Sequence, residues 1–87
     1  MSDRKTPYRK IMGPGDLGFL LRQVRKERGL TQKQLADRAG VGPRLIGEVE
    51  RGKATAEIGK VFRLLASLGM VVSVQPTPPK RWGVRLD

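Results

Sequence analysis

From Thr31 to Lys53 the sequence reads TQKQLADRAGVGPRLIGEVERGK. Thr31 precedes Gln34 by three positions, which is the spacing of a capping box and predicts a helix that begins just after Thr31. We expect this helix to end near Ala39, because Gly40 adopts the left-handed backbone conformation of a tight turn without strain. The stretch therefore opens with a short helix and a sharp turn.

A second helix is predicted directly after the turn. Gly42 is an acceptable N-cap and proline is favoured at the first helical position, so the helix is expected from Pro43 to about Arg51. The positions that face the other helix or fill the space beneath the turn are all small or apolar: Leu35, Ala36, Ala39, Val41, Ile46 and Val49. Each match alone is ordinary core packing, but the joint pattern predicts a helix-turn-helix unit.

The chain is strongly basic. Its 87 residues include 18 Lys and Arg against eight Asp and Glu, a formal net charge of +10. This exceeds the magnitude of roughly 2 to 8 that solubility requires of a small domain. It predicts a polyphosphate partner, because each phosphate that binds releases counterions. RNA fits less well than DNA, since aromatic residues make up only 5% and offer no stacking platform.

Catalysis is not expected of this composition. The chain has no Cys and no His, which removes the commonest nucleophile, general base and transition-metal ligands. We therefore expect no enzyme activity, no metal and no cofactor. No apolar run approaches the roughly 18 residues that span a bilayer, and no signal peptide pattern opens the chain. A cytoplasmic, nucleoid-associated protein is expected.

A further helix is predicted before the motif. It begins at Gly15 or Asp16 and ends before Gly29. Its inward face carries apolar residues at helical spacing: Leu17, Leu20, Leu21 and Val24. Its outer, solvent-facing side is predicted to carry Arg22, Arg25 and Lys26.

A helix and a strand are predicted after the motif. The helix spans about residues 56–68, and its apolar stripe is made of Ile58, Val61, Phe62, Leu65 and Leu68. Residues 70–74 are mostly β-branched and lie between Gly69 and Pro76, which predicts a short strand. Nothing else in the chain has a strand pattern, so we expect this strand to pair with the same strand of a second copy.

The chain divides into three predicted parts. Residues 1–14 form a basic arm that carries Arg4, Lys5, Arg9 and Lys10. Residues 15–75 form the domain with its C-terminal strand. Residues 76–87 form a flexible, Pro-rich tail that contains Trp82 and Leu86.

Residues 15–68 resemble the Cro and lambda-repressor-like (Xre) DNA-binding fold. The resemblance rests on the runs LTQKQLA at 30–36, GV at 40–41 and IGEVERG at 46–52. It implies an all-α fold of four to five helices, a lambda-repressor-like helix-turn-helix domain, to which a short C-terminal dimerising β-strand is added. With that strand, the arm and the tail, the whole chain resembles the HipB-type antitoxins.

In this family the second helix of the motif lies in the major groove of duplex DNA. The residues at its reading positions here are Pro43, Arg44, Gly47 and Glu48. Arg44 is the predicted base reader, because a guanidinium binds O6 and N7 of guanine together; a phosphate contact is the alternative. Leu45 fits a thymine methyl and Glu48 a cytosine amine, although both are equally compatible with no contact. Pro43 departs from the Gln or Ser common in the family and offers only van der Waals contact.

The resemblance implies DNA contacts for four further residues: phosphate or base contacts for Gln32 and Lys33, and backbone contacts for Arg51 and Lys53. Gln32 and Lys33 lie at the N-terminus of the first helix of the motif, where helix amides also favour phosphate. Arg51 and Lys53 follow the second helix. The cations of the arm are expected to add phosphate or minor-groove contacts.

The function implied by the resemblance is that of a homodimeric transcriptional repressor. Its expected partners are a duplex DNA operator in its own operon, a second copy joined through residues 70–74, and a HipA-like kinase toxin for which it is the antitoxin. Two alternatives stay open. One is a binding inhibitor that acts chiefly through Trp82 and Leu86, since an exposed indole is a typical interface anchor. The other is a stand-alone phage-type regulator with no toxin partner.

Overall fold

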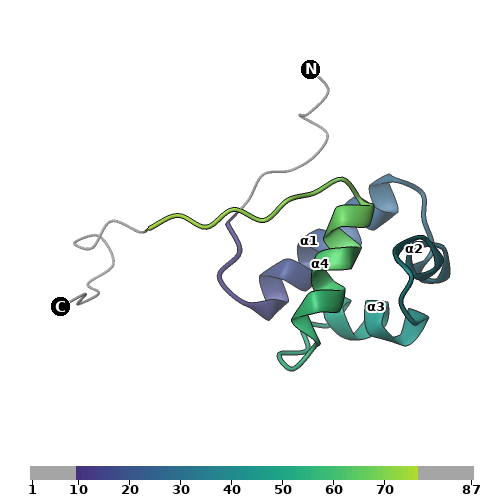
Figure 1. Ribbon diagram of the computed structural model, residues 1–87, viewed down its shortest axis with the longest axis horizontal. Coiled ribbons are helices and arrows are strands. Elements are labelled where there is room, and N and C mark those ends of the chain that lie inside the picture. The colour runs from purple at the N-terminus through teal and green to yellow at the C-terminus, as the bar shows by residue number, and fades with distance from the viewer. Residues whose placement is uncertain (1–9, 77–87) are drawn as a thin grey trace, which may run out of the picture.

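The computed structural model describes residues 10–76, which form four α-helices (Figure 1). They are α1 (Pro14–Glu27), α2 (Gln32–Ala39), α3 (Pro43–Glu50) and α4 (Ile58–Ser67). All four helices expected from the sequence are present, and the all-α class is confirmed. Two predicted starts are wrong, since α1 begins at Pro14 and α4 begins two residues later than expected.

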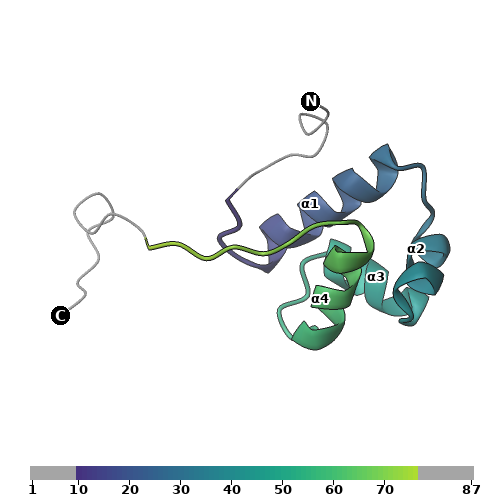
Figure 2. The same cartoon turned by 45° about the horizontal axis from the view of Figure 1, so that its top comes forward.

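α2 and α3 are the central pair of helices, and each also packs against an outer helix. α1 packs across α3, and α2 packs against both α3 and α4. Figure 2 shows α2 at the far end of the molecule from the two ends of the described chain. A Cβ atom at Gly18 of α1 would overlap the carbonyl oxygen of Val49. The absence of a side chain at Gly18 therefore sets how closely α1 approaches α3.

The local structure of the motif agrees with its predicted caps. The Thr31 hydroxyl accepts a hydrogen bond from the Gln34 amide at 3.0 Å, and the Gln34 side chain accepts one from the Thr31 amide at 2.9 Å. Gly40 has φ 73° and ψ 35°, the left-handed conformation that the turn requires. Gly42 is the N-cap of α3 and Pro43 its first residue. These four predictions are confirmed.

The hydrophobic core draws on all four helices. Its buried members are Leu20, Leu21, Val24, Leu35, Ala36, Ile46, Val49, Val61, Leu64, Leu65 and Leu68. Burying a Leu, Ile or Val side chain contributes roughly 1.5–3 kcal/mol. Leu35, Ala36 and Ile46 are completely buried, so the inward positions predicted for the two helices of the motif hold.

The apolar stripe predicted for α4 is partly wrong. Leu64 is completely buried, although the prediction left it out of the stripe. Ile58 and Phe62, which the helical spacing places on the stripe, are 67% and 50% exposed. The buried face of α4 is therefore turned away from Phe62 toward Leu64, which leaves an apolar surface on the outside of the helix.

The predicted strand is not formed within residues 10–76. Residues 71–76 are extended and exposed and project from the helices on the same side as residues 10–12 (Figures 1 and 2). The described residues offer no strand with which this segment could form a ladder, so the strand stays a prediction. The tail residues Trp82 and Leu86, and most of the basic arm, lie outside the described residues.

None of the helices in residues 10–76 has the length and hydrophobicity that a membrane-crossing segment needs.

Candidate nucleic-acid interface

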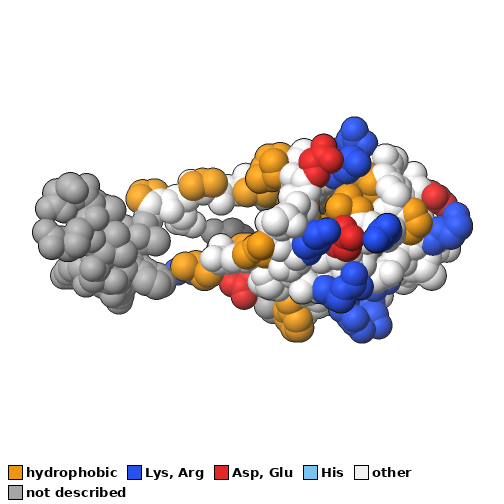
Figure 3. Space-filling view, turned by 90° about the horizontal axis from the view of Figure 1, so that it is seen from below, with side chains coloured by type: hydrophobic (Ala, Val, Ile, Leu, Met, Phe, Trp, Pro, Cys, Tyr) orange, Lys and Arg blue, Asp and Glu red, His pale blue; other side chains and the backbone are white. Residues whose placement is uncertain are grey.

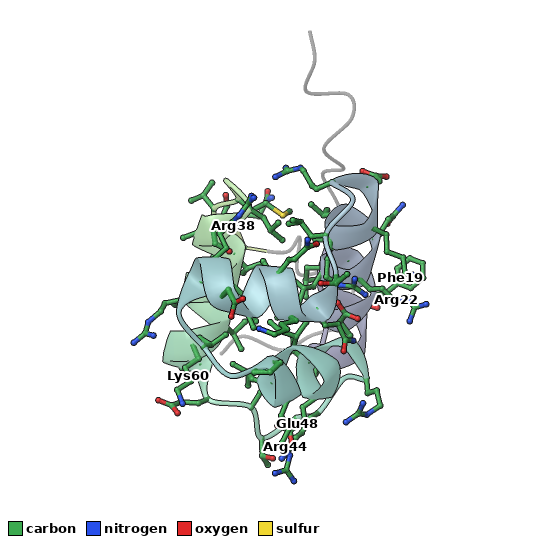
Figure 4. The ribbon with its side chains drawn as sticks, turned by 90° about the vertical axis from the view of Figure 1, so that its right-hand side faces the viewer. Phe19, Arg22, Arg38, Arg44, Glu48 and Lys60 are labelled. Atoms are coloured by element: carbon green, nitrogen blue, oxygen red, sulfur yellow. The ribbon has the colours of Figure 1, made fainter. Side chains whose placement is uncertain are left out.

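Three charged side chains meet at the outer face of α3, two from the helix and one from Lys53 beyond its end. The Arg44 side chain is 90% exposed, and its Nε lies 3.5 Å from Oε2 of Glu48 one turn later. Nζ of Lys53 lies 3.5 Å from the same carboxylate oxygen. Figure 4 shows Arg44 and Glu48 together on the side of α3 that faces away from α1 and α4. One acid thus sits between two cations, and the cluster carries a net positive charge.

A second group of side chains joins three helices beneath this surface. Nε of Arg25 on α1 donates to Oε2 of Glu50 at 2.6 Å, and its Nη2 donates to Oε1 at 3.1 Å. Nη1 of Arg25 donates to the Leu30 carbonyl at 2.7 Å. The side chains of Arg25 and Glu50 are only 8% and 3% exposed. The prediction that placed Arg25 on the solvent-facing side of α1 is therefore wrong.

This buried ion pair also holds a residue of the predicted interface. Nε2 of Gln32, the first residue of α2, donates to Oε1 of Glu50 at 3.1 Å. The Gln32 side chain is thereby fixed relative to α3. Glu50 was missed as a positioning residue, because its partners lie 18 and 25 residues away and no local spacing reveals them.

Gly47 lies beneath two neighbouring side chains. It is buried, and an atom at its Cβ position would lie 3.2 Å from Nη1 of Arg51 and 3.8 Å from Oε1 of Gln32. Three predicted site residues therefore come together at the middle of α3. Gly47 itself is covered, so the surface that a ligand meets at this position is made by Arg51 and Gln32.

The remaining predicted residues of the motif occupy different surroundings. Pro43 is exposed at the start of α3, whereas Leu45 is half-buried and packs against the core. Lys33 on α2 is 76% exposed, and its Nζ lies 3.3 Å from the carboxylate of Asp37. Pro43 and Lys33 are available to a ligand, while Leu45 has only part of its side chain free.

The charged side chains on the face that carries α3 are mainly basic (Figure 3). Figure 3 views the molecule from this side and shows Lys and Arg side chains spread across it, with most of the acidic side chains directly beside a basic one. In residues 10–76 no three His, Cys, Asp or Glu side chains are grouped as ligands of a metal ion. A surface of this kind suits a polyanion.

The turn between α2 and α3 has a support that the sequence did not reveal. Nη1 of Arg63 on α4 donates to the carbonyl of Gly40 at 3.1 Å. The bond satisfies a carbonyl at the end of α2. Nothing in the local sequence pattern connects Arg63 to a turn 23 residues earlier.

Comparison with known proteins identifies this arrangement. The Helix-turn-helix (HTH_3) family model matches residues 21–71, which include the end of α1, the motif and α4. The chain belongs to the helix-turn-helix family. This helix-turn-helix protein is 48% identical over 66 residues to the uncharacterized HTH-type transcriptional regulator y4mF of Sinorhizobium fredii (strain NBRC 101917 / NGR234). The match covers 76% of this chain and 87% of that protein.

Two solved structures share the fold of this helix-turn-helix protein. A chain of the "HipB-O4 20mer complex" superposes with a TM-score of 0.75 at 25% identity. A chain of the "Structure of HipA-HipB-O2-O3 complex" gives 0.75 at 27% identity. Each comparison covers 82% of this chain and 100% of the other. The resemblance to the Xre fold and to HipB-type proteins is thus confirmed, and the protein is a DNA-binding transcriptional regulator.

Proposed function

We propose that the protein is a homodimeric repressor that binds the promoter of its own operon and is the antitoxin of a HipA-like kinase toxin. The observation that carries this proposal is the likeness to the HipB chain of a complex with HipA, which extends over the whole of that chain at 27% identity. A regulator of this kind acts on cytoplasmic, nucleoid DNA.

α3 is the proposed reading helix. Its most exposed charged side chain is Arg44, which we assign to a guanine, while Glu48 orients Arg44 and Lys53 through the two contacts of 3.5 Å. Gln32 and Lys53 bind phosphates on either side of the groove. Loss of a base contact lowers specificity, whereas loss of a backbone contact lowers affinity for every sequence. Variants of the two kinds of residue therefore have different expected effects.

The other predicted contacts keep narrower roles in this proposal. Lys33 adds a phosphate contact from the N-terminus of α2, and Pro43 touches a base edge through van der Waals contact alone. Leu45 offers a thymine methyl only the exposed part of its side chain, because the rest packs against the core.

The dimer is proposed to form at the C-terminal side of α4. Residues 71–74 are extended and exposed, and Val71 and Val74 are 86% and 93% exposed. A hollow of about 270 Å³ is lined by Phe62, Leu65, Met70, Val71 and Val72. Pairing with the same segment of a second copy satisfies the backbone groups and covers these apolar side chains.

The promoter upstream of the gene for this chain tests autoregulation. We expect footprinting with the purified full-length protein to show two protected half-sites separated by one helical turn or a multiple of it. Tight binding to selected sequences elsewhere, with no protection of this promoter, would reject autoregulation. Co-purification of the native complex tests the toxin, and we expect a kinase of the HipA type to be retained.

A regulator without a toxin is the second candidate. The relative y4mF, at 48% identity, is described only as a transcriptional regulator. A native complex that contains the operator and a second copy but no kinase supports this candidate. If a kinase is present, truncation after Pro76 tests the binding inhibitor: loss of kinase retention with DNA binding intact assigns the contact to the segment with Trp82 and Leu86.

A further inference from the structure

Gly47 of α3 has no side chain, and the side chains of Arg51 and Gln32 occupy the space above it. It lies in the middle of the helix, and its position is covered by the guanidinium of Arg51 at 3.2 Å and by the carboxamide of Gln32 at 3.8 Å, measured from an ideal Cβ. A contact of 3.2 Å is tighter than most real Cβ contacts, so a side chain at residue 47 requires Arg51 to move.

Arg51 reaches this point from the end of the helix. It is the residue after α3, and its side chain runs back by one turn, because residues four apart share a helix face and side chains lean toward the N-terminus. Its backbone N–H donates to the Gly47 carbonyl at 3.1 Å. The backbone of Arg51 therefore stays anchored whether or not its guanidinium is displaced.

The charge of Arg51 is unbalanced within the described part of the chain. Arg44 and Lys53 both pair with Glu48, and Arg25 pairs with Glu50. Among residues 10–76 no carboxylate lies within ion-pair distance of Arg51, which is exposed. Within the described residues its guanidinium is thus a cation beside Gln32 with no carboxylate partner.

We infer that Gly47 is a positioning residue for Arg51: the absence of a side chain at residue 47 lets the Arg51 guanidinium lie beside Gln32, where it binds a phosphate of duplex DNA. The inference rests on the proposed placement of α3 in the DNA groove. It differs from the sequence-based expectation, which placed the Arg51 contact at the end of the helix, by a full helical turn.

The test is a series of side chains at residue 47. Gly47→Ala and Gly47→Leu are measured with a duplex that the wild-type protein selects from a random pool and with a scrambled duplex. We expect affinity for both duplexes to fall, by about twofold for Ala and about tenfold for Leu. For the Leu variant, the slope of log affinity against log salt concentration should decrease in magnitude by about one. The thermal midpoint should not fall for Gly47→Ala, because alanine favours the helix.

Gly59 supplies the matched control. It lies inside α4, and among the described residues no atom lies within 4 Å of its Cβ position apart from its chain neighbours and the backbone of its own helix. Gly59→Ala and Gly59→Leu make the same chemical changes in a helix, so we expect the DNA affinity of both variants to equal that of the wild type. A fall of affinity in the Gly59 series equal to that in the Gly47 series would overturn the inference.

The Arg51→Ala background shows whether Gly47 acts through Arg51. In that background we expect Gly47→Leu to change affinity by less than about twofold, since the displaced group is already absent. An equal loss in both backgrounds means that residue 47 itself meets the DNA, and the inference is then wrong. Unchanged affinity in the Gly47 series refutes it as well. Failure of the wild-type protein to bind either duplex would instead refute the proposed function.

Discussion

Arg25 on α1 holds Glu50 on α3 through two hydrogen bonds of 2.6 and 3.1 Å, in a site where both side chains are almost fully buried. Glu50 in turn accepts a hydrogen bond from Gln32 on α2. The pair therefore connects the scaffold helix α1 to both helices of the motif. Its role is to fix the first residue of α2 relative to α3, the proposed reading helix.

Removing one partner of this ion pair is expected to be costly. Arg25→Ala or Glu50→Ala leaves a buried charge uncompensated, which typically costs about 3–5 kcal/mol of unfolding free energy. Urea denaturation followed by circular dichroism measures the loss. Arg25→Met combined with Glu50→Leu removes both charges, and we expect the double variant to be more stable than either single alanine variant.

The exposed pair of Lys33 and Asp37 is the control for that experiment. Their side chains are 76% and 68% exposed, and exposed ion pairs contribute about 0–1 kcal/mol. Lys33→Ala should therefore leave the urea midpoint nearly unchanged. A loss for Arg25→Ala as small as that for Lys33→Ala would contradict the structural role of the buried pair.

The close crossing of α1 and α3 gives a second prediction on stability. A methyl group at Gly18 overlaps the backbone oxygen of Val49, so Gly18→Ala is expected to lower the unfolding free energy by about 1–3 kcal/mol. Gly15 lies in the same helix with open space at its Cβ position. Gly15→Ala should be neutral or stabilising by up to about 1 kcal/mol, and thermal unfolding of the two variants distinguishes these outcomes.

Glu48 is expected to lower the affinity of the protein for DNA. Its carboxylate lies 3.5 Å from both Arg44 and Lys53, so Glu48→Gln frees two cations. We expect affinity for a scrambled duplex to rise by about threefold to tenfold at low salt, and the preference for the selected duplex to fall. Fluorescence anisotropy measures both quantities.

Glu57→Gln removes the same charge from the exposed pair of Glu57 and Lys60, which involves α4 instead of α3. Its effect on DNA affinity should be much smaller than that of Glu48→Gln. Equal effects would show that net charge, and not the contact with Arg44 and Lys53, controls affinity.

Proline substitutions test the proposed strand pairing. Successive N–H groups of a strand point to opposite edges, so either Val71→Pro or Val72→Pro removes a pairing donor. We expect one of them to raise the dimer dissociation constant by about tenfold or more. Sedimentation equilibrium measures it, and Val72→Thr, which stays β-branched, is the control. The proposal fails if both proline variants dimerise as tightly as the wild type.

The motif was predictable because its signals are local. The bonds between Thr31 and Gln34 and the conformation of Gly40 depend on residues within a few positions, and the sequence contains all of them. The face of α4 was not predictable in the same way. Phe62 and Leu64 both lie at helical spacing from Leu65 or Leu68, and only the position of the other helices decides which of the two is buried.

The positioning residues were hidden for a related reason. Arg25 lies at the edge of the apolar stripe of α1, where periodicity does not separate a buried cation from an exposed one. Its burial depends on Glu50, which is 25 residues away. The position of the Arg51 guanidinium beside Gln32 depends in the same way on the packing of α2 against α3. Long-range pairing, which one sequence does not encode in any local spacing, determines these details.

In the proposed complex with DNA, Arg44 reads a base while Lys53 binds the backbone. The most direct measurement compares Arg44→Ala and Lys53→Ala on a selected operator duplex, on its single-base variants and on a scrambled duplex. We predict that Arg44→Ala flattens the preference at one base pair, by about 1–3 kcal/mol, whereas Lys53→Ala weakens binding to every duplex alike and lowers the salt slope by about one. If Arg44→Ala weakens all duplexes equally, as Lys53→Ala does, the assignment of base reading to α3 through Arg44 is contradicted.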